Sequence, residues 1–336
     1  MTSDSQRRVV VVAGPTAAGK SAAAIDLALR FGGEVVNADS MQVFRFLDIG
    51  TAKPSPAERA RVAHHLLDVV APDVPYSAGR YSREARAAAA AIHARGGIVF
   101  LTGGTGLYIR AFLEGLIEAG EAEPGLRSEL EREAGRAVEA GDPHHLHRRL
   151  AALDPDAARR IHPNDLRRTV RALELLQCTG TPASRLRAAH DFSDRPFDVL
   201  YLVLDPGRAE LDARIDARAQ AMIDSGLLQE CRSLAARGYG PELRPLQAIG
   251  YRHLMPVVAG RDTLANALEA MRRDTRRFAR RQRTWFRAVP EARWLRADER
   301  DRIDALVAAF AARRSSGTGQ RPGRPASEAR YWAGET

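Results

Sequence analysis

The sequence has very little cysteine and no long apolar run. Only Cys178 and Cys231 occur among its 336 residues, so neither a disulfide framework nor a cysteine-based zinc finger is available. No apolar segment approaches the roughly 18 residues that a membrane span needs. The polar start, from Met1 to Arg8, lacks the apolar region of a signal peptide. These absences predict a soluble, cytoplasmic protein without a membrane partner.

Lysine is equally scarce. The chain holds 51 lysines and arginines against 42 acids, yet only Lys20 and Lys53 are lysines. The formal net charge of +9 favours a polyanionic partner. Lysine carries a compact, strongly hydrated charge and arginine a planar one, so we expect the two lysines where arginine will not serve. Because it contains Lys53, we interpret Gly50–Pro54 as a second functional segment. The alternative is that Lys53 is an ordinary lysine of a loop.

The clearest pattern that is present is a phosphate-binding loop near the start of the chain. Its residues are Gly14, Pro15, Thr16, Ala17, Ala18, Gly19, Lys20 and Ser21. They follow the apolar run Val9–Val12 and precede a helix-favouring stretch from Ala22 to Phe31, which is the context that this motif requires. Glycines let backbone amides surround an anion, and the helix N-terminus adds its positive end. Lys20 supplies charge and Ser21 a hydroxyl ligand for Mg²⁺; an ordinary glycine turn is the alternative.

Strand and helix patterns alternate through the first third of the chain. The expected strands are Val9–Ala13, Glu34–Ala38, Ile98–Thr102 and, later, Val199–Leu204. With a helix from about Ser82 to Arg95, this alternation predicts an α/β fold with a P-loop NTPase-like core and a parallel sheet. Ligands of such sheets bind beyond the carboxyl ends of the strands. Three polar segments fall there, namely the phosphate loop, Asp39–Gln42 and Gly103–Gly106.

We expect four divisions of the chain. Residues 1–117 form the first part of the α/β core. Residues 118–197, where strand signals stop and charged helical segments begin, form a helical insertion. Residues 198–313 complete the core and add basic C-terminal helices, with Leu211, Ile215, Met222 and Ile223 as candidate buried positions. Residues 314–336, rich in Gly, Pro and Ser, form a disordered tail.

The segment Asp262–Arg287 combines a packing stripe with rows of arginine. The expected packing positions recur every three or four residues: Leu264, Leu268, Met271, Thr275, Phe278, Gln282 and Trp285. Two rows of arginine lie beside them: Arg276, Arg280, Arg283 and Arg287, then Arg273, Arg277 and Arg281. Asp274 is the only acid between Met271 and Arg287. Repulsion among the arginines would therefore destabilise this helix unless an anionic partner bound to it. We interpret this helix as a nucleic-acid contact, with a solvated basic helix as the alternative.

Together with further motifs, these patterns make the chain resemble a known family, the bacterial tRNA dimethylallyltransferases of the IPP transferase family. The resemblance extends from about Val9 to Arg296. Beyond the phosphate loop it rests on Asn37–Phe44, Asp48–Pro54, His64–Asp68, Gly103–Tyr108, Ile161–Asp165, Arg171–Glu174, Ala248–Arg252 and Arg281–Phe286. Two departures are mild: Phe44 stands where the family often has Tyr, and Arg280 where it often has Lys.

The resemblance implies a reaction and its site. A dimethylallyl group passes from dimethylallyl diphosphate to N6 of the adenine 3′-adjacent to the anticodon, within the anticodon stem-loop of tRNA. Apart from the resemblance, we expect a monomer. Asp39 is implied as the general base and Thr105 as a neighbour of the amine, while Thr16, Lys20 and Arg218 contact the donor. The chemistry agrees, because a delocalised amine needs proton removal and a departing diphosphate needs amides, Lys20 and Mg²⁺. Helix caps are the alternatives for Asp39 and Thr105.

The same resemblance assigns a larger set of residues to tRNA contact. They are Asp39, Ser40, Met41, Gln42, Thr105, Arg127, Arg167, Arg168, Arg171, Gln247, Gly250, Tyr251, Arg252, Arg280, Arg281, Arg283 and Arg287. They fall in the core, in the insertion and on the arginine helix, so the insertion is expected to face tRNA. Because a loop base is normally stacked, we expect the target base to be extruded into a pocket.

Two other functions fit part of the sequence. A P-loop kinase of a small metabolite, using ATP as phosphoryl donor, explains the phosphate loop and Asp39 but neither the arginine helix nor the insertion. A non-catalytic RNA-binding ATPase explains the helix, but no clear Walker-B strand ending in Asp stands out. His144, His145 and His147 invite a metal site, yet no convergent ligand set accompanies them, and we interpret them as part of a solvated face.

Overall fold

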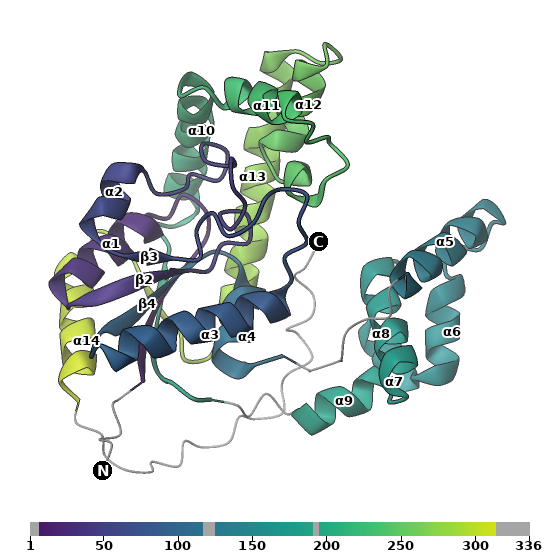
Figure 1. Ribbon diagram of the computed structural model, residues 1–336, viewed down its shortest axis with the longest axis horizontal. Helices are drawn as coiled ribbons and strands as arrows, with labels where there is room; N and C mark the ends of the chain where they lie inside the picture. The colour runs from purple at the N-terminus through teal and green to yellow at the C-terminus, as the bar shows by residue number, and fades with distance from the viewer. Residues whose placement is uncertain (1–6, 117–124, 191–194, 314–336) are drawn as a thin grey trace. The chain divides into compact units, whose positions relative to one another are not determined.

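The computed structural model describes residues 7–116, 125–190 and 195–313 (Figure 1). Within them the chain divides into two compact units. The larger unit holds the described residues up to Leu113 and from Arg195 onward, and the smaller holds those from Glu114 to His190. These bounds lie within a few residues of the insertion expected at 118–197. The tail expected at 314–336 lies outside the described residues.

Six parallel strands of the described chain form one sheet in the larger unit, in the order β3-β2-β4-β1-β5-β6. They are β1 (Arg8–Ala13), β2 (Gly33–Asn37), β3 (His64–His65), β4 (Ile98–Gly103), β5 (Asp198–Leu204) and β6 (Arg293–Leu295). The expected parallel α/β fold is confirmed. Sequence patterns missed both edge strands, because two or three residues are too few to show an alternation.

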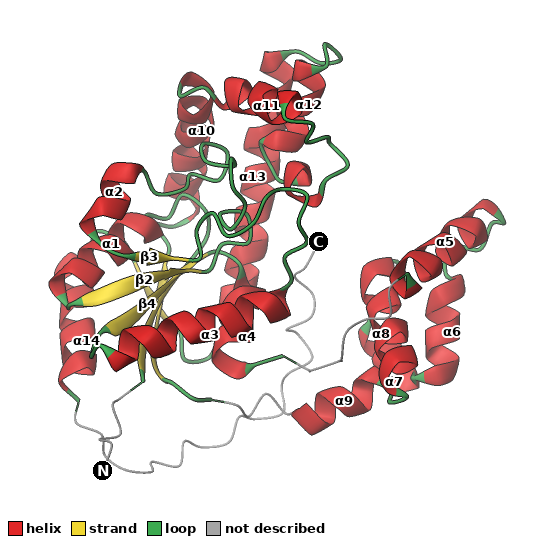
Figure 2. Cartoon of the chain, in the orientation of Figure 1, coloured by secondary structure: helices red, strands yellow, loops and turns green. Residues whose placement is uncertain are grey.

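The side chains of β1 alternate between two hydrophobic layers, as the period of a strand requires. Val9 and Val11 pack toward α3 (Ala78–Ala94) and α4 (Gly106–Glu114), while Val10 and Val12 pack toward α1 (Lys20–Arg30) and α14 (Arg300–Ala312). The short helix α2 (Pro56–Arg61) begins with a capping box between Ser55 and Glu58. The sheet is therefore covered on both faces by helices (Figure 2).

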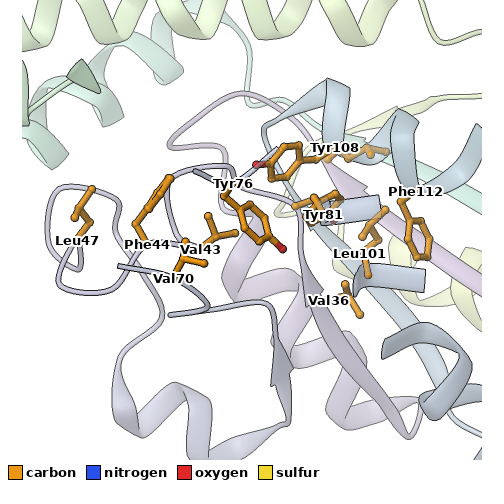
Figure 3. Packing of buried hydrophobic residues seen from close by; sticks show 14 of the residues in the cluster. Val36, Val43, Phe44, Leu47, Val70, Tyr76, Tyr81, Leu101, Tyr108 and Phe112 are labelled. Atoms are coloured by element: carbon orange, nitrogen blue, oxygen red, sulfur yellow. The ribbon is translucent and has the colours of Figure 1, made fainter. Parts of the chain in front are cut away.

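The core on the α3 and α4 side extends into the loop that follows β2. Val43, Phe44 and Leu47 of that loop are buried in the same cluster as Val36 and Leu101 of the sheet (Figure 3). The rings of Tyr81 and Tyr108 stack there with centroids 4.0 Å apart. The loop after β2 is consequently held against the core along its length, and it positions the residues that begin at Asp39.

The last part of the larger unit is mostly helical. It contains α10 (Arg208–Asp224), α11 (Leu227–Ala236), the 3₁₀ turn η1 (Arg244–Gln247), α12 (Tyr251–Val258) and α13 (Leu264–Arg287). Helix α10 packs against α13 through Leu211, Ile215 and Ala279, with Ala17 of the phosphate loop beside them. Leu211 and Ile215 are buried as expected, whereas Met222 and Ile223 are only partly buried.

Helix α13 is rotated relative to the packing stripe that the sequence suggested. Its buried residues are Ala267, Met271, Ala279, Gln282 and Phe286. Leu264 was expected in the stripe but is exposed, so that expectation is wrong. Alanine carries little pattern signal, and here Ala267 and Ala279 allow the helix to approach its neighbours closely.

The smaller unit is helical. Its helices are α5 (Leu126–Glu139), α6 (His145–Leu153), α7 (Pro155–Arg160), α8 (Leu166–Thr179) and α9 (Ala183–His190). Leu130, Leu146, Leu150 and Leu173 lie in a hydrophobic cluster of this unit's own. Across both units, no helix of the described residues combines the length and the apolar character that crossing a membrane would take.

Candidate active site

The phosphate loop joins the carboxyl end of β1 to α1. Gly14 has φ +143°, and a Cβ added to it would lie 2.3 Å from the Leu204 carbonyl oxygen, so only glycine fits there. Ala17 and Gly19 also have positive φ angles, 63° and 89°. The chain thereby curls before α1 begins at Lys20. The first amides of α1 have no intrahelical partner, so this turn is suited to an anion.

Two cations lie close together beside this loop. Lys20 Nζ donates to the Pro15 carbonyl at 2.7 Å. Burial, followed by the positive charge of Arg218, lowers the pKa of Lys20 to about 8, and Asp39 partly opposes that effect. Burial likewise lowers the pKa of the Arg218 guanidinium, which Asp39 again opposes. The single carboxylate of Asp39 only partly balances the positive charge of Lys20 and Arg218. This excess of positive charge favours the binding of a multiply charged anion.

Asp39 is fixed at the end of β2 by its neighbour Asn37. Asn37 accepts from the Asp39 amide at 3.0 Å and donates to the Asp39 and Leu66 carbonyls at 3.1 and 3.0 Å. The Asp39 Oδ1 atom accepts from the Met41 amide at 2.9 Å. Within the described residues, Oδ2 has no hydrogen-bond partner. The carboxylate is therefore held through one oxygen, and the other is available to accept a proton.

Thr105 follows β4, the strand beside β2, and contacts the segment that begins at Asp39. Its amide donates to the Ala38 carbonyl at 3.1 Å. Its hydroxyl oxygen accepts from the Ser40 amide at 3.0 Å and lies 3.2 Å from Ser40 Oγ. The Thr105 carbonyl also accepts hydrogen bonds from the Tyr108 and Ile109 amides, so Thr105 caps α4 as well. The structure thus brings Thr105 and Asp39 together through Ser40.

Gln282 of α13 connects the two loops. Its Oε1 atom accepts from the Thr16 amide and its Nε2 atom donates to the Gly104 carbonyl, both at 2.9 Å. The sequence suggested only that Gln282 packs. A large polar side chain in a mostly apolar stripe was the one signal for a hydrogen-bonding role.

The residues expected to contact tRNA differ greatly in exposure. Gln42 is buried, and its amide donates to the Thr51 carbonyl at 3.1 Å. Tyr251 is fully buried, and its hydroxyl donates to Glu230 at 2.6 Å. Gly250, with φ +97°, begins α12. The side chains of Gln42 and Tyr251 are thus almost wholly covered by protein. Both hold the loop of residues 48–52 in place.

The arginines of α13 are also divided. Arg283 pairs with Asp205 at 2.7 Å, with side chains 18% and 7% exposed, and Arg276 pairs with Asp216. Asp205 directly follows β5 and Asp216 lies on α10, so the sequence count of compensating acids within the helix missed them. Arg280 and Arg287 are exposed, and Arg281 lies partly over the Phe278 ring. Arg273, Arg277, Arg280 and Arg287 are the exposed arginines of this helix, and Arg273 and Arg277 lie beside Asp274. Arg252 of α12 is exposed as well and pairs with the same Asp274 at 2.6 Å, and Gln247 is also exposed.

In the smaller unit, a buried carboxylate organises the expected tRNA residues. Glu174 is 2% exposed and contacts Arg127 and Arg171, each at 2.7 Å. Burial raises the pKa of Glu174, but the hydrogen bonds from both arginines outweigh it and hold the pKa below its usual value. Arg167 is exposed, whereas Arg168 pairs with Asp165 at 3.3 Å. His145 lies against Glu133, and His147 contacts the Ile161 carbonyl.

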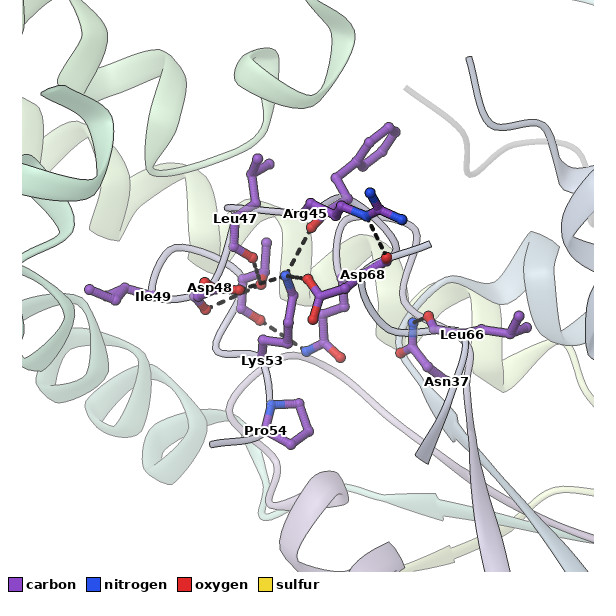
Figure 4. A network of polar contacts seen from close by, with 12 residues as sticks. Asn37, Arg45, Leu47, Asp48, Ile49, Lys53, Pro54, Leu66 and Asp68 are labelled. Atoms are coloured by element: carbon purple, nitrogen blue, oxygen red, sulfur yellow. Dashed lines mark hydrogen bonds and ion pairs between the residues drawn. The ribbon is translucent and has the colours of Figure 1, made fainter. Parts of the chain in front are cut away.

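Lys53 has a structural environment. Its ammonium is fully enclosed and contacts Asp48 at 2.6 Å, Asp68 at 2.7 Å and the Phe44 carbonyl at 2.8 Å (Figure 4). These contacts tie the loop after β2 to the segment after β3. The expectation that Lys53 marks a second functional segment is not supported by this geometry. Lys53 supports the loop that carries Asp39.

A Mg²⁺ ion fits the loop only together with its anion. Ser21 is exposed on the first turn of α1, and none of the described residues hydrogen-bonds its hydroxyl. The described residues contain no group of three or more His, Cys, Asp or Glu that could hold a metal. A cation here would take most of its oxygen ligands from phosphate and water, as Mg²⁺ commonly does.

Comparison with known proteins gives a consistent result. A family model described as IPP transferase matches residues 42–289, and one described as isopentenyl transferase matches residues 7–70. The chain is 47% identical over 306 residues to a tRNA dimethylallyltransferase of Desulfatibacillum aliphaticivorans, covering 91% of this chain and 99% of that protein. It is 49% identical over 307 residues to that of Desulfosudis oleivorans, covering 90% and 96%.

Solved structures agree with these sequence relatives. The fold is similar to the tRNA isopentenylpyrophosphate transferase of Bacillus halodurans, with 34% identity, a TM-score of 0.67 and coverage of 91% of this chain and 97% of that one. It is also similar to a eukaryotic dimethylallyltransferase acting on tRNA, with 30% identity, a TM-score of 0.74 and coverage of 91% and 78%.

Proposed function

The chain belongs to the IPP transferase family and is a tRNA dimethylallyltransferase, and we propose the residues that carry each part of its reaction. The observation that carries the proposal is the electrostatic interaction of Lys20 and Arg218 with each other and with Asp39, beside the phosphate loop. These residues provide cations for a diphosphate and a carboxylate for a proton. The acceptor atom that we propose is N6 of the adenine 3′-adjacent to the anticodon.

The donor side of our proposal is the phosphate loop. Dimethylallyl diphosphate binds with its diphosphate against the loop amides, Lys20 and Arg218, and with Thr16 beside it. Support comes from the curled backbone at Ala17 and Gly19 and from the weak charge balance around the two cations. The same groups stabilise the negative charge that grows on the diphosphate as the carbon–oxygen bond breaks.

Ser21 is our candidate for holding Mg²⁺ beside that diphosphate. Its exposed hydroxyl is compatible with the role. A bound Mg²⁺ supplies additional positive charge to the leaving diphosphate.

On the acceptor side, Asp39 acts as the general base. The N6 lone pair attacks C1 of the dimethylallyl group, the N6–C1 bond forms, and the C1–O bond breaks with its electron pair leaving on diphosphate. The N6 proton passes to the available oxygen of Asp39. Thr105 positions the amine from the neighbouring strand, and support comes from its contacts to Ser40.

For tRNA we propose that the exposed basic residues bind the anticodon stem-loop. Arg280 and Arg287 of α13 and Arg252 of α12 supply phosphate contacts from the larger unit, and Arg167 and Arg171 from the smaller. Because a stacked adenine cannot reach Asp39, the base is extruded from the loop. We further propose that one chain suffices, since donor and acceptor residues lie in the same unit, and that the reaction takes place in the cytoplasm.

A donor comparison tests this function against the kinase alternative. Unmodified tRNA and dimethylallyl diphosphate are incubated with the protein, and the tRNA is digested and weighed by mass spectrometry. A parallel reaction contains ATP and small alcohols. We expect one adenosine to gain the mass of a dimethylallyl group less one hydrogen. A phosphorylated alcohol together with unchanged tRNA would establish the kinase instead.

A further inference from the structure

Gln282 occupies a position between the two substrate sides of the centre. It is 6% exposed, and its carboxamide makes two hydrogen bonds of 2.9 Å, one to the Thr16 amide and one to the Gly104 carbonyl. The direction of the carboxamide is determined, because its oxygen faces an N–H group and its nitrogen faces a carbonyl. Thr16 belongs to the phosphate loop, and Gly104 precedes Thr105.

The approach of α13 to the second loop depends on glycine. A Cβ at Gly104 would lie 2.2 Å from Gln282 Nε2, and a Cβ at Gly106 would lie 2.0 Å from Trp285 Nε1. Because Trp285 comes three positions after Gln282, the two side chains share a helix face. They meet the glycines on either side of Thr105. The position of Thr105 is therefore set by α13 as well as by β4.

The Thr16 amide is not available to bind an anion, because its hydrogen bond goes to Gln282. In a phosphate-binding loop the amides point toward the phosphate, but here this one donates to Gln282. The Ala18 amide is likewise bonded to the Pro15 carbonyl, at 3.3 Å. The remaining amides, at Ala17, Gly19 and the start of α1, are left for the diphosphate. The Gln282 contact thus serves the placement of the loop rather than anion binding.

We propose that Gln282 is a positioning residue that sets the distance between the bound diphosphate donor and the reacting amine. One end of its carboxamide holds the donor loop at Thr16. The other end acts through Gly104 and Thr105 on Ser40 and Asp39, which border the amine. The inference rests on the proposed function, because it assigns the donor to one loop and the acceptor to the other. Displacement of reacting atoms by about 1 Å costs about 100-fold in rate.

The first test replaces Gln282 with methionine, which has a similar length and no hydrogen-bonding amide. We expect the single-turnover rate at saturating tRNA and dimethylallyl diphosphate to fall about 100-fold, while the dissociation constants of both substrates change less than 3-fold. Met271→Ala, in the buried face of the same helix, is the control for general destabilisation and should keep the rate. A normal rate in Gln282→Met, or an equal loss in Met271→Ala, would overturn the proposal.

The second test is the variant Gln282→Glu, followed as the pH changes. The ionised carboxylate of the new side chain accepts from the Thr16 amide but cannot donate to the Gly104 carbonyl. The protonated carboxylic acid does both, as the native glutamine does, and burial favours the protonated form. The rate of the variant relative to wild type, measured between pH 8 and pH 5.5, should rise at least 10-fold as the pH falls. A flat ratio would overturn the proposal, because the rate would then not depend on the contact to the Gly104 carbonyl.

The two proposals fail in different ways. If the wild-type chain transfers no dimethylallyl group to tRNA, the proposed function is wrong and the inference falls with it. If the wild type is active and Gln282→Met is equally active, only the inference is wrong.

Discussion

Lys20 and Lys53, the two lysines of the chain, have opposite electrostatic surroundings. Lys53 is enclosed between the carboxylates of Asp48 and Asp68, which satisfy its charge. Lys20 faces the cation Arg218 and is balanced only in part by Asp39. An unbalanced cation destabilises the protein without its ligand but binds an incoming anion strongly. Lys20 is thus suited to a charged substrate, and Lys53 to holding a loop.

Lys20 should give the reaction an alkaline limit. Its pKa is lowered to about 8, so the free enzyme loses this positive charge as the pH rises through 8. We expect kcat/KM for dimethylallyl diphosphate, which reports the free enzyme, to fall about tenfold per pH unit above that value. In Lys20→Arg, which stays protonated, the fall should disappear even though overall activity is lower. A wild-type profile that stays flat up to pH 9.5 would contradict the role of Lys20.

Loss of the lysine charge should affect chemistry more than RNA binding. In Lys20→Ala, turnover should decrease by at least 100-fold, a loss typical of removing one preorganised group that stabilises developing charge. The tRNA dissociation constant should change little, because in the proposed site Lys20 contacts the diphosphate and not the RNA. Normal turnover at saturating tRNA combined with weaker tRNA binding would reverse this assignment.

Asp39 offers a second residue-level prediction. Asp39→Asn keeps the shape and the contact to the Met41 amide but removes the proton acceptor. General bases typically contribute about 100-fold to 10,000-fold, so single-turnover rates should drop by at least the lower figure while both substrates still bind. Rapid quench at saturating substrates measures this rate. A near-normal value would make Asp39 a residue that positions adenine.

Single residues were predictable where a local motif determines them. The phosphate loop and Asp39 were picked out because each follows a strand pattern, whereas Thr105 was picked out by the family resemblance. The Asp205 partner of Arg283 lies 78 residues before it in the sequence (283 − 205), and the Thr16 partner of Gln282 lies 266 residues before it. No local pattern carries such pairings. They arise only once α13 crosses the carboxyl edge of the sheet.

At the level of elements, α13 both anchors the loops at the sheet edge and exposes basic side chains. Its sequence alone did not distinguish the residues that do each. Gln282 and Trp285 fix one face of the helix to the loops that carry Thr16 and Thr105. Within the arginine row on another face, Arg283 pairs with Asp205 just after β5, whereas Arg280 and Arg287 remain exposed. The paired and the exposed arginines belong to the same row, so the periodicity of charge did not separate them. The acids that distinguish them, Asp205 and Asp216, are supplied by other elements.

The exposed and the paired arginines of α13 should respond differently to neutralisation. In Arg280→Gln/Arg287→Gln, tRNA binding should weaken, and the slope of log affinity against log salt should decrease by about 0.7 to 0.9 for each lost phosphate contact. Stability should not change. In Arg283→Gln the nearly buried Asp205 loses its partner, so the free energy of unfolding should drop by about 3 kcal/mol. An unchanged salt slope in the double variant would show that Arg280 and Arg287 are solvated and do not contact tRNA phosphates.

At the scale of the whole molecule, an α/β core is interrupted by a unit with its own hydrophobic cluster. The interruption is compatible with folding of the core, because the two ends of the gap meet. Phe112, near the end of α4, stacks on Phe197, just before β5, with ring centroids 4.6 Å apart and an interplanar angle of 6°. The change from strand patterns to charged helical segments revealed the insertion in the sequence, but the closeness of its two ends did not follow from any pattern.

The last prediction uses that closeness to separate the substrates. Replacing residues 114–194 with about six Gly and Ser residues bridges the gap, since such a linker spans roughly 12–15 Å on average. The shortened protein should unfold cooperatively and bind dimethylallyl diphosphate within 3-fold of wild type, because Lys20, Arg218 and the phosphate loop all lie in the larger unit. Its tRNA affinity should fall at least 10-fold, because Arg167 and Arg171 are removed. Calorimetry with the donor and filter binding with tRNA measure the two effects. Undiminished tRNA affinity would show that the larger unit alone recognises the anticodon stem-loop, and lost donor binding would show that the smaller unit contributes to the phosphate site.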